Sequence, residues 1–226
     1  MKICIVTASF GSAHAGNKQT SATIELPDFP SQSTEHALEY VQLNDSNFAS
    51  RELAMHPRLK GKIPKMLQWM QSDADYYIWL DSKFRIKSPN FVEWQLRSIG
   101  GKQICLFEHP SRSSIKAELA FMQERMQAGD AYLLERYRGE PMAEQVDSYL
   151  SDKSFEDCGL FSCGMFIYHK SLIENRAYNL LTDWFFHCTY WSVQDQLSLP
   201  YLLQKHKIDY ELYDDMILRN PFTIYG

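Results

Sequence analysis

An aspartate stands at the carboxyl end of a short apolar run. Residues 76–80 read Tyr-Tyr-Ile-Trp-Leu, and Asp81 follows them directly. Such a run, bounded by polar residues, is typical of a buried strand in an α/β sheet. Ligands of open α/β sheets collect beyond the carboxyl ends of the strands, so Asp81 is a candidate for contact with a ligand or a metal. The alternative is that Asp81 only begins a turn.

Two further pairs of polar residues adjoin apolar stretches. Glu108 and His109 follow the apolar run 103–107, which we expect to be another strand. Asp195 and Gln196 stand at the start of an apolar helical stretch. Because the helix dipole by itself favours a carboxylate in the first turn, a purely structural role is open for Asp195.

The segment before the Asp81 strand is basic in a chain that is otherwise acidic. Residues 56–65 read His-Pro-Arg-Leu-Lys-Gly-Lys-Ile-Pro-Lys. Its basic residues are Arg58, Lys60, Lys62 and Lys65. Lysine and arginine bind phosphate oxygens, so this segment is interpreted either as a clamp for a diphosphate or as a solvated loop before a helix at 65–71.

The first expected strand, residues 2–7, runs into small residues that begin with Ala8. Small residues at the end of a first strand let a ligand approach the backbone closely, as nucleotide sites require. Thr7 and Ala8 are therefore candidate contacts. The chain contains neither G-x-G-x-x-G nor G-x-x-x-x-G-K-[ST], which excludes the dinucleotide fingerprint and the Walker-type phosphate loop.

Composition narrows the class of protein. The 226 residues, 45% of them hydrophobic, are enough to bury the core of one domain. The formal net charge of −5 argues against a nucleic-acid partner, because such a surface needs a surplus of lysine and arginine. No apolar run approaches the roughly 20 residues that span a bilayer. We expect a cytoplasmic protein without a transmembrane segment, and leave open a peripheral position at the inner face of the membrane.

The remaining pattern alternates strands and helices. In chain order we expect a loop at 12–36, a strand at 39–43, a helix at 88–97, a helical region at 111–152, a strand at 160–168, a helix at 172–187 and a last strand near 208–212. Gly164 lies inside one of these strands, which indicates a bulge or the close approach of another group, such as a ligand.

Three of these features, in this order, resemble the GT-A fold glycosyltransferases. They are the strand end Trp-Leu-Asp-Ser-Lys at 79–83, the glycine-bearing strand Phe-Ser-Cys-Gly-Met-Phe-Ile-Tyr at 161–168 and the helix start Asp-Gln-Leu-Ser-Leu at 195–199. In those enzymes a strand ends in D-x-D, a later strand carries a small-residue signature, and a D-Q-x-x-L helix start follows. The sequence is most similar to a small family-eight-like branch, found in bacteria and in plant cell-wall and mucilage proteins, that has W-[IL]-D-x-K in place of D-x-D.

The resemblance implies a GT-A-like α/β fold, with a mixed, mostly parallel sheet flanked by helices. It implies one glycosyltransferase-like domain over residues 1–226, with a helical insert at about 111–152. The implied activity is hexosyltransferase-like: transfer of a sugar from a UDP- or GDP-sugar to a carbohydrate or glycan acceptor, as in polysaccharide biosynthesis. One alternative is a protein that binds a nucleotide-sugar or a carbohydrate without catalysis. Another is an interaction module built on the helical region.

The candidate residues take their roles from this likeness together with their chemistry. Asp195 and Asp81 would be catalytic. The donor contacts would be Thr7, Ala8, Lys62, Lys65, Asp81 and Lys83. The acceptor contacts would be Glu108, His109 and Gln196. In an inverting enzyme Asp195 would be the general base, whereas in a retaining enzyme it would position the acceptor or stabilise an oxocarbenium-like state.

Lys83 departs from the D-x-D pattern, because it stands where the second carboxylate is expected. A protonated lysine cannot ligate a hard cation. Either Lys83 and the lysines of the basic segment neutralise the donor phosphates without a metal, or Asp81 holds Mn²⁺ or Mg²⁺ with a distant residue such as His109 or Asp157. We favour weak or absent metal dependence.

Overall fold

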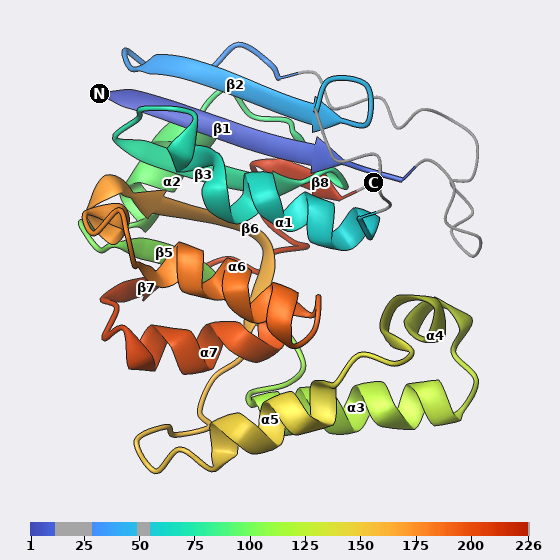
Figure 1. Ribbon diagram of the computed structural model, residues 1–226. Coiled ribbons are helices and arrows are strands. Elements are labelled where there is room, and N and C mark those ends of the chain that lie inside the picture. Colours follow the sequence, from blue (N-terminus) through green and yellow to red (C-terminus); the bar gives the residue numbers. More distant parts are fainter. Residues whose placement is uncertain (12–28, 49–54, 226) are drawn as a thin grey trace.

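The computed structural model describes residues 1–11, 29–48 and 55–225 (Figure 1). Its centre is a six-stranded sheet in the order β2-β1-β3-β6-β5-β7. These strands are β1 (Lys2–Ser9), β2 (Ala37–Asn44), β3 (Tyr76–Asp81), β5 (Ile104–Glu108), β6 (Phe161–His169) and β7 (Tyr210–Leu212). A two-stranded sheet pairs β4 (Phe84–Ile86) with β8 (Thr223–Tyr225).

The central sheet is mixed and mostly parallel, as expected. Strand β1 is parallel to β2 and to β3, and β5 is parallel to β7. Strand β6 runs antiparallel to both of its neighbours, β3 and β5. The carboxyl ends of β1 and β3 therefore meet at one edge of the sheet, next to the middle of β6.

Helices cover both faces of the sheet. They are α1 (Pro57–Leu67), α2 (Phe91–Ser98), α6 (Leu180–Tyr190) and α7 (Asp195–Lys205). Successive strand residues point to opposite faces. Tyr77 and Trp79 accordingly pack against α1, α6 and α7, whereas Ile78 and Leu80 belong to the apolar cluster that includes α2. The apolar run before Asp81 is thus buried on both sides.

Three helices between β5 and β6 form a group of their own, at the lower right of Figure 1. They are α3 (Ile115–Gln127), α4 (Ala131–Tyr137) and α5 (Met142–Leu150). We call them the helical insert. Their buried side chains share one apolar cluster with Val193 and Leu197, at the start of α7. This packing anchors the insert beside the residue pair Asp195 and Gln196.

Two element predictions are wrong. Residues 57–67 form α1, whereas we expected a helix only at 65–71. Pro57 fits the first helical turn because its missing N–H is not needed there. The helix expected at 172–187 begins only at Leu180, after a 3₁₀ turn at Lys170–Ile173. Asn179 and Thr182 form a capping box that fixes this start.

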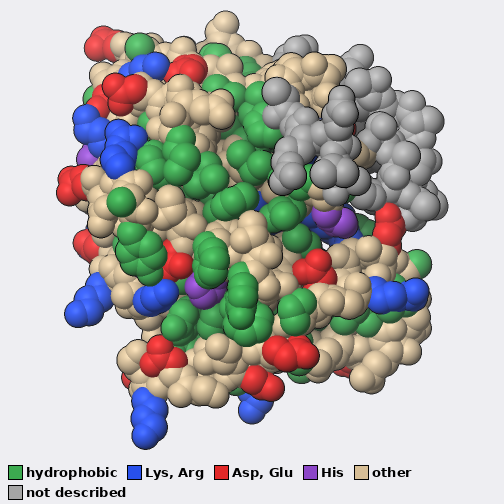
Figure 2. All heavy atoms as spheres, viewed as in Figure 1, with side chains coloured by type: hydrophobic (Ala, Val, Ile, Leu, Met, Phe, Trp, Pro, Cys, Tyr) green, Lys and Arg blue, Asp and Glu red, His purple; other side chains and the backbone are tan. Residues whose placement is uncertain are grey.

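Most of the loop expected at 12–36 lies outside the described residues. In the described part of the chain, no helix is long and apolar enough to cross a membrane. Hydrophobic side chains gather on the face shown in Figure 2. Among the exposed large hydrophobic residues are Phe186 and Tyr190 of α6.

Candidate active site

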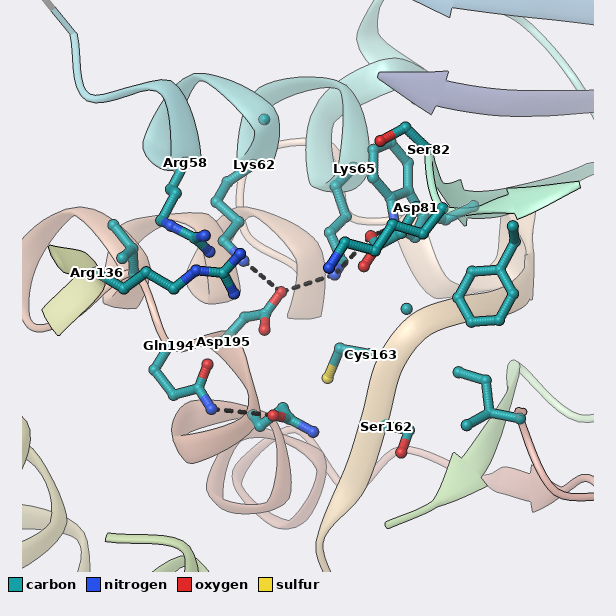
Figure 3. Close-up of a pocket in the computed structure, with 18 of the residues that line it drawn as sticks. Arg58, Lys62, Lys65, Asp81, Ser82, Arg136, Ser162, Cys163, Gln194 and Asp195 are labelled. Carbon is teal, nitrogen blue, oxygen red and sulfur yellow. Dashed lines mark hydrogen bonds and ion pairs between the residues drawn. The ribbon is translucent and has the colours of Figure 1, made fainter. Parts of the chain in front are cut away.

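A cleft of about 630 Å³ opens at the carboxyl ends of β1 and β3. Its walls come from these strand ends, from α1, from the middle of β6, from the start of α7 and from the helical insert. Figure 3 shows that charged side chains from several of these elements point into the same space. Segments far apart in the sequence therefore meet at the edge of the sheet where Asp81 lies.

Helix α1 presents three cations to the cleft. Arg58, Lys62 and Lys65 are spaced by four and three positions, so they share one face of the helix. Lys60 lies on another face, where it is buried and pairs with Asp45 at 2.7 Å. The basic segment is thus a charged helix face rather than a solvated loop.

Asp195 lies in the first turn of α7 and is 5% exposed. Its Oδ2 atom accepts a hydrogen bond from Lys62 Nζ at 2.6 Å and forms an ion pair with Lys65 Nζ at 2.7 Å (Figure 3). Burial opposes ionisation of this carboxyl group, but the two lysines outweigh it and lower the pKa of Asp195 to about 2. Asp195 is therefore ionised at neutral pH, and it is a weak proton acceptor.

Lys65 connects the two candidate catalytic carboxylates. Besides its contact with Asp195, its Nζ atom lies 3.8 Å from Asp81 Oδ1. The ammonium group also faces the rings of Trp79 at 5.6 Å and Trp184 at 5.9 Å. Burial favours the neutral amine, but Asp195 and Asp81 outweigh this effect and raise the pKa of Lys65. Lys65 is thus a buried, permanently charged group.

Asp81 is oriented by its own strand. Trp79 Nε1 donates a hydrogen bond to Asp81 Oδ1 at 2.7 Å, and 45% of the Asp81 side chain is exposed. Gly164 of β6 lies opposite. A Cβ atom at Gly164 would meet the Phe84 ring at 2.9 Å and Asp81 Oδ2 at 3.4 Å. The close approach indicated by this glycine is therefore made by side chains of the protein itself.

A chain of hydrogen bonds ties the insert to the start of α7. Tyr137 of α4 donates to Gln194 Oε1 at 2.9 Å. Gln194 Nε2 donates to Glu118 at 3.0 Å and to Gln196 at 2.9 Å, and Gln196 donates to the carbonyl of Phe161 at 3.0 Å. Glu118 and Gln194 line the cleft but were not candidates, since only the packing of the insert brings them there.

His109 lines the cleft, whereas the neighbouring Glu108 points to solvent and is not part of its wall. His109 Nδ1 accepts the backbone N–H groups of Ser111 at 3.3 Å and Arg112 at 3.1 Å. Burial and the nearby Arg112 lower the pKa of His109, so its ring is neutral at neutral pH. Arg112 itself forms an ion pair with Glu118.

The remaining candidates lie at the ends of β1 and β3. Lys83 lines the cleft beyond Asp81, and its Nζ atom lies 5.9 Å from the centre of the Tyr225 ring. Ala8 also lines the cleft. Thr7, one position earlier in the strand, is fully buried and does not contribute to the wall.

Arg136 of α4 is a cleft residue that the sequence interpretation missed. Its guanidinium group lies 3.3 Å above the ring of Tyr132 and points toward the same space as Arg58 (Figure 3). Burial and the proximity of Arg58 lower the pKa of Arg136 to about 10, so it remains charged. Arg136 lies in the helical region expected at 111–152, and no local signal in the sequence marks it as a cleft residue.

Cations outnumber carboxylates in this cleft. Among the described residues, the lysines and arginines that line it are Arg58, Lys62, Lys65, Lys83, Arg85, Arg112 and Arg136, and the carboxylates are Asp81, Glu118 and Asp195. The whole chain, by contrast, has a net charge of −5. A site with this charge favours an anionic ligand.

The same residues fit a hard divalent cation poorly. Such an ion needs several oxygen ligands, but Asp195 is engaged by two lysines and Lys65 lies near Asp81. Asp157, considered above as a partner of Asp81, accepts two backbone N–H groups at the start of α3. Within residues 1–11, 29–48 and 55–225, no three His, Cys, Asp or Glu side chains are arranged to hold a metal.

The chain is similar to a described protein family and to a solved structure. A family model described as "TOD1/MUCI70, glycosyltransferase-like domain" matches residues 48–223. The crystal structure of mouse xyloside xylosyltransferase 1, in its apo form, is similar at a TM-score of 0.47 and 9% sequence identity, covering 95% of this chain and 86% of that chain. No curated protein matches the chain.

Proposed function

Because the chain belongs to the TOD1/MUCI70 glycosyltransferase-like family, we propose that it transfers a sugar from a UDP- or GDP-sugar to a glycan acceptor. The observation that carries this proposal is the concentration of seven lysines and arginines, against three carboxylates, in one cleft of an acidic protein. A nucleotide-sugar brings a diphosphate to the site, and this diphosphate becomes the leaving group.

Lysines are the proposed partners of that diphosphate. When the bond between the anomeric carbon and the phosphate oxygen breaks, the oxygen gains negative charge, and fixed cations nearby stabilise it. Lys65 and Lys83 flank Asp81 at the end of β3, and Lys62 lies within 2.6 Å of Asp195. These groups are held by the fold before the substrate arrives, so they need little rearrangement in the transition state.

We further propose that no metal is needed for this step. The second carboxylate of D-x-D is replaced by Lys83, and cations already occupy the surroundings of Asp81 and Asp195. In this scheme Asp81 contacts the donor through its exposed carboxylate, which Trp79 holds in place.

The proposed role of Asp195 follows from its ion pairs with Lys62 and Lys65, which lower its pKa to about 2. A carboxylate that is so weakly basic takes a proton from a hydroxyl group inefficiently. We therefore assign Asp195 to two other tasks: holding Lys62 and Lys65 in position, and placing negative charge near the electron-poor anomeric carbon. The acceptor hydroxyl is proposed to approach between Asp195 and the side of the cleft formed by His109 and Gln196. Its oxygen bonds to the anomeric carbon as the bond to the phosphate oxygen breaks, and its proton passes to the departing diphosphate, directly or through water.

Binding of a nucleotide-sugar without transfer is a second candidate function. Two observations favour it: Lys83 replaces a carboxylate, and Asp195 is engaged in two ion pairs. A binding protein would be stabilised against unfolding by UDP or GDP but would release no nucleotide from a sugar donor.

The test uses the purified chain with a panel of UDP- and GDP-sugars, and measures release of nucleoside diphosphate and transfer to a mixture of oligosaccharides. Lys65→Gln is expected to weaken diphosphate binding by about tenfold or more, because a charge-assisted contact is lost. Lys60→Gln is the matched control: it removes an equally buried lysine of α1 that lies outside the cleft wall.

The outcomes separate the candidates. Nucleotide release by the unmodified protein, reduced in Lys65→Gln but not in Lys60→Gln, supports transfer. Stabilisation by UDP or GDP with no release from any donor supports binding alone. If neither nucleotide binds and no donor is turned over, the proposed function is wrong.

A further inference from the structure

Two arginines from different parts of the chain share one region of the cleft. Arg58 comes from the first turn of α1, and Arg136 comes from the last turn of α4 in the helical insert. Figure 3 shows both guanidinium groups turned into the space to one side of Asp195, away from Asp81. Each of the two side chains is partly buried.

Neither arginine is paired directly with a carboxylate in the part of the protein that is described, although Asp195, Asp81 and Glu135 act on Arg58 at longer range. By contrast, Arg112, which lines the same cleft, pairs with Glu118. Arg58 and Arg136 also repel each other, which contributes to the lowered pKa of Arg136. Two like charges held together inside a cleft are stabilised when an anion binds between them.

The donor alone does not balance the charge of the cleft. Its seven cations exceed its three carboxylates by four. The diphosphate of a nucleotide-sugar carries about two negative charges, so about two positive charges are left over. Lys62 and Lys65 lie close to Asp195 and Asp81, Lys83 follows Asp81 in the cleft wall, and Arg112 pairs with Glu118. Of the three arginines that remain, Arg85 is exposed, whereas Arg58 and Arg136 are partly buried and are available for a different group.

The surroundings of the arginines suit a sugar that bears an anionic group. The Arg136 guanidinium lies 3.3 Å above the Tyr132 ring, and the Arg58 guanidinium lies 6.0 Å from the centre of the Tyr137 ring. Stacking on a ring limits the motion of a guanidinium group, whose planar fork binds a carboxylate or phosphate through two parallel hydrogen bonds. Aromatic side chains beside it provide an apolar surface for a sugar ring.

We propose that Arg58 and Arg136 form an anion subsite that binds a carboxylate or phosphate group on the acceptor sugar. The subsite rests on the proposed function and narrows it: the acceptor is an acidic glycan. It also gives the helical insert a role, since α4 supplies one of the two arginines.

Binding can be measured without knowledge of the donor. The probes are a neutral hexose trisaccharide, a hexuronic acid trisaccharide and a trisaccharide phosphorylated on one hexose, each titrated calorimetrically into the full chain with saturating UDP. We expect at least one anionic probe to bind about tenfold or more tightly than the neutral probe. The preferred anionic probe distinguishes carboxylate from phosphate.

Variants test the two residues. Arg58→Gln and Arg136→Gln are expected to remove this preference while leaving the dissociation constant of UDP unchanged. Arg58→Lys and Arg136→Lys keep the charge but lose the fork, and should restore only part of the preference. Arg138→Gln is the matched control, because Arg138 is an exposed arginine that follows α4 and lies outside the cleft wall.

Two results would overturn this inference. One is equal binding of the neutral and anionic probes by the unmodified protein. The other is a loss of UDP affinity in the arginine variants, which would place both residues in the donor site. Neither result touches the proposed transfer of a sugar, which fails if the unmodified protein turns over no nucleotide-sugar.

Discussion

The central residue of the cleft is Asp195, and its neighbours explain its chemistry. A carboxylate that is almost completely buried would normally be driven toward its neutral form. Here Lys62 and Lys65 approach it within 2.7 Å, and its pKa falls to about 2 instead of rising. The three side chains form a fixed charged unit, in which removal of one member leaves the others buried without compensation.

Asp195→Asn should therefore affect both turnover and stability. We expect turnover to fall by about 100-fold or more, because the two lysines lose the group that orients them. We also expect the free energy of unfolding to fall by about 3 kcal/mol or more, since buried charges are left unpaired. Urea unfolding and nucleotide release measure the two effects.

The pH dependence of this destabilisation has a definite sign. The folded-state pKa of Asp195 lies below the ordinary value of 3.8, so its ionised form stabilises the fold above about pH 4. This contribution is lost as the pH falls toward about 2. The difference in free energy of unfolding between the unmodified protein and Asp195→Asn should stay constant down to about pH 4 and shrink at lower pH. A difference that does not shrink would contradict the lowered pKa of Asp195.

Two elements bring the charged side chains together. Helix α1 presents Arg58, Lys62 and Lys65 on one face, and β6 carries Gly164 at the point where Asp81 needs room. The glycine is a packing requirement, because the Phe84 ring is itself buried and cannot move aside easily.

A pair of glycine substitutions separates packing from backbone effects. Gly164→Ala should lower the free energy of unfolding by about 1 to 3 kcal/mol, since its Cβ atom would lie 2.9 Å from the Phe84 ring. Gly61→Ala, inside α1, should raise it by about 0.5 to 1 kcal/mol, because the nearest atom to its Cβ would be 4.0 Å away and alanine favours a helix. Denaturant unfolding gives both values, and equal signs would refute the packing argument.

For the molecule as a whole, the main feature of the site is that positive charges gather in one cleft of a negatively charged protein. The chain is acidic, yet the cleft at the carboxyl ends of β1 and β3 is lined by an excess of cations. The mixed sheet makes this possible, because it brings β3, the antiparallel β6 and the start of α7 to one edge.

This arrangement predicts activity without a divalent ion. Nucleotide release from a sugar donor should persist in excess EDTA, because lysines perform the charge neutralisation that a metal otherwise supplies. The comparison is made with the same protein supplemented with Mn²⁺ or Mg²⁺. Loss of activity in chelator, restored by either ion, would show that Asp81 belongs to a metal site.

Several site residues could be predicted from the sequence because their signals are local. Asp81 ends an apolar run, and Asp195 with Gln196 begins a helix; both patterns are visible within a few positions. The ends of β1 and β5 were less informative, because the sequence did not show which of two adjacent residues faces the cleft. Ala8 and His109 line the cleft, while the adjacent Thr7 is buried and Glu108 points to solvent, because successive strand residues alternate between faces.

The sequential pattern of apolar and polar residues was enough to define the α/β class and the acids at the strand and helix ends, because periodicity and end positions are properties of neighbouring residues. Folding in three dimensions set the rest. Lys62 and Asp195 are 133 positions apart, and Arg136 reaches the cleft only through the packing of the insert. Ion pairing, burial and the pKa values that follow from them depend on distances between such remote groups, which no local pattern encodes.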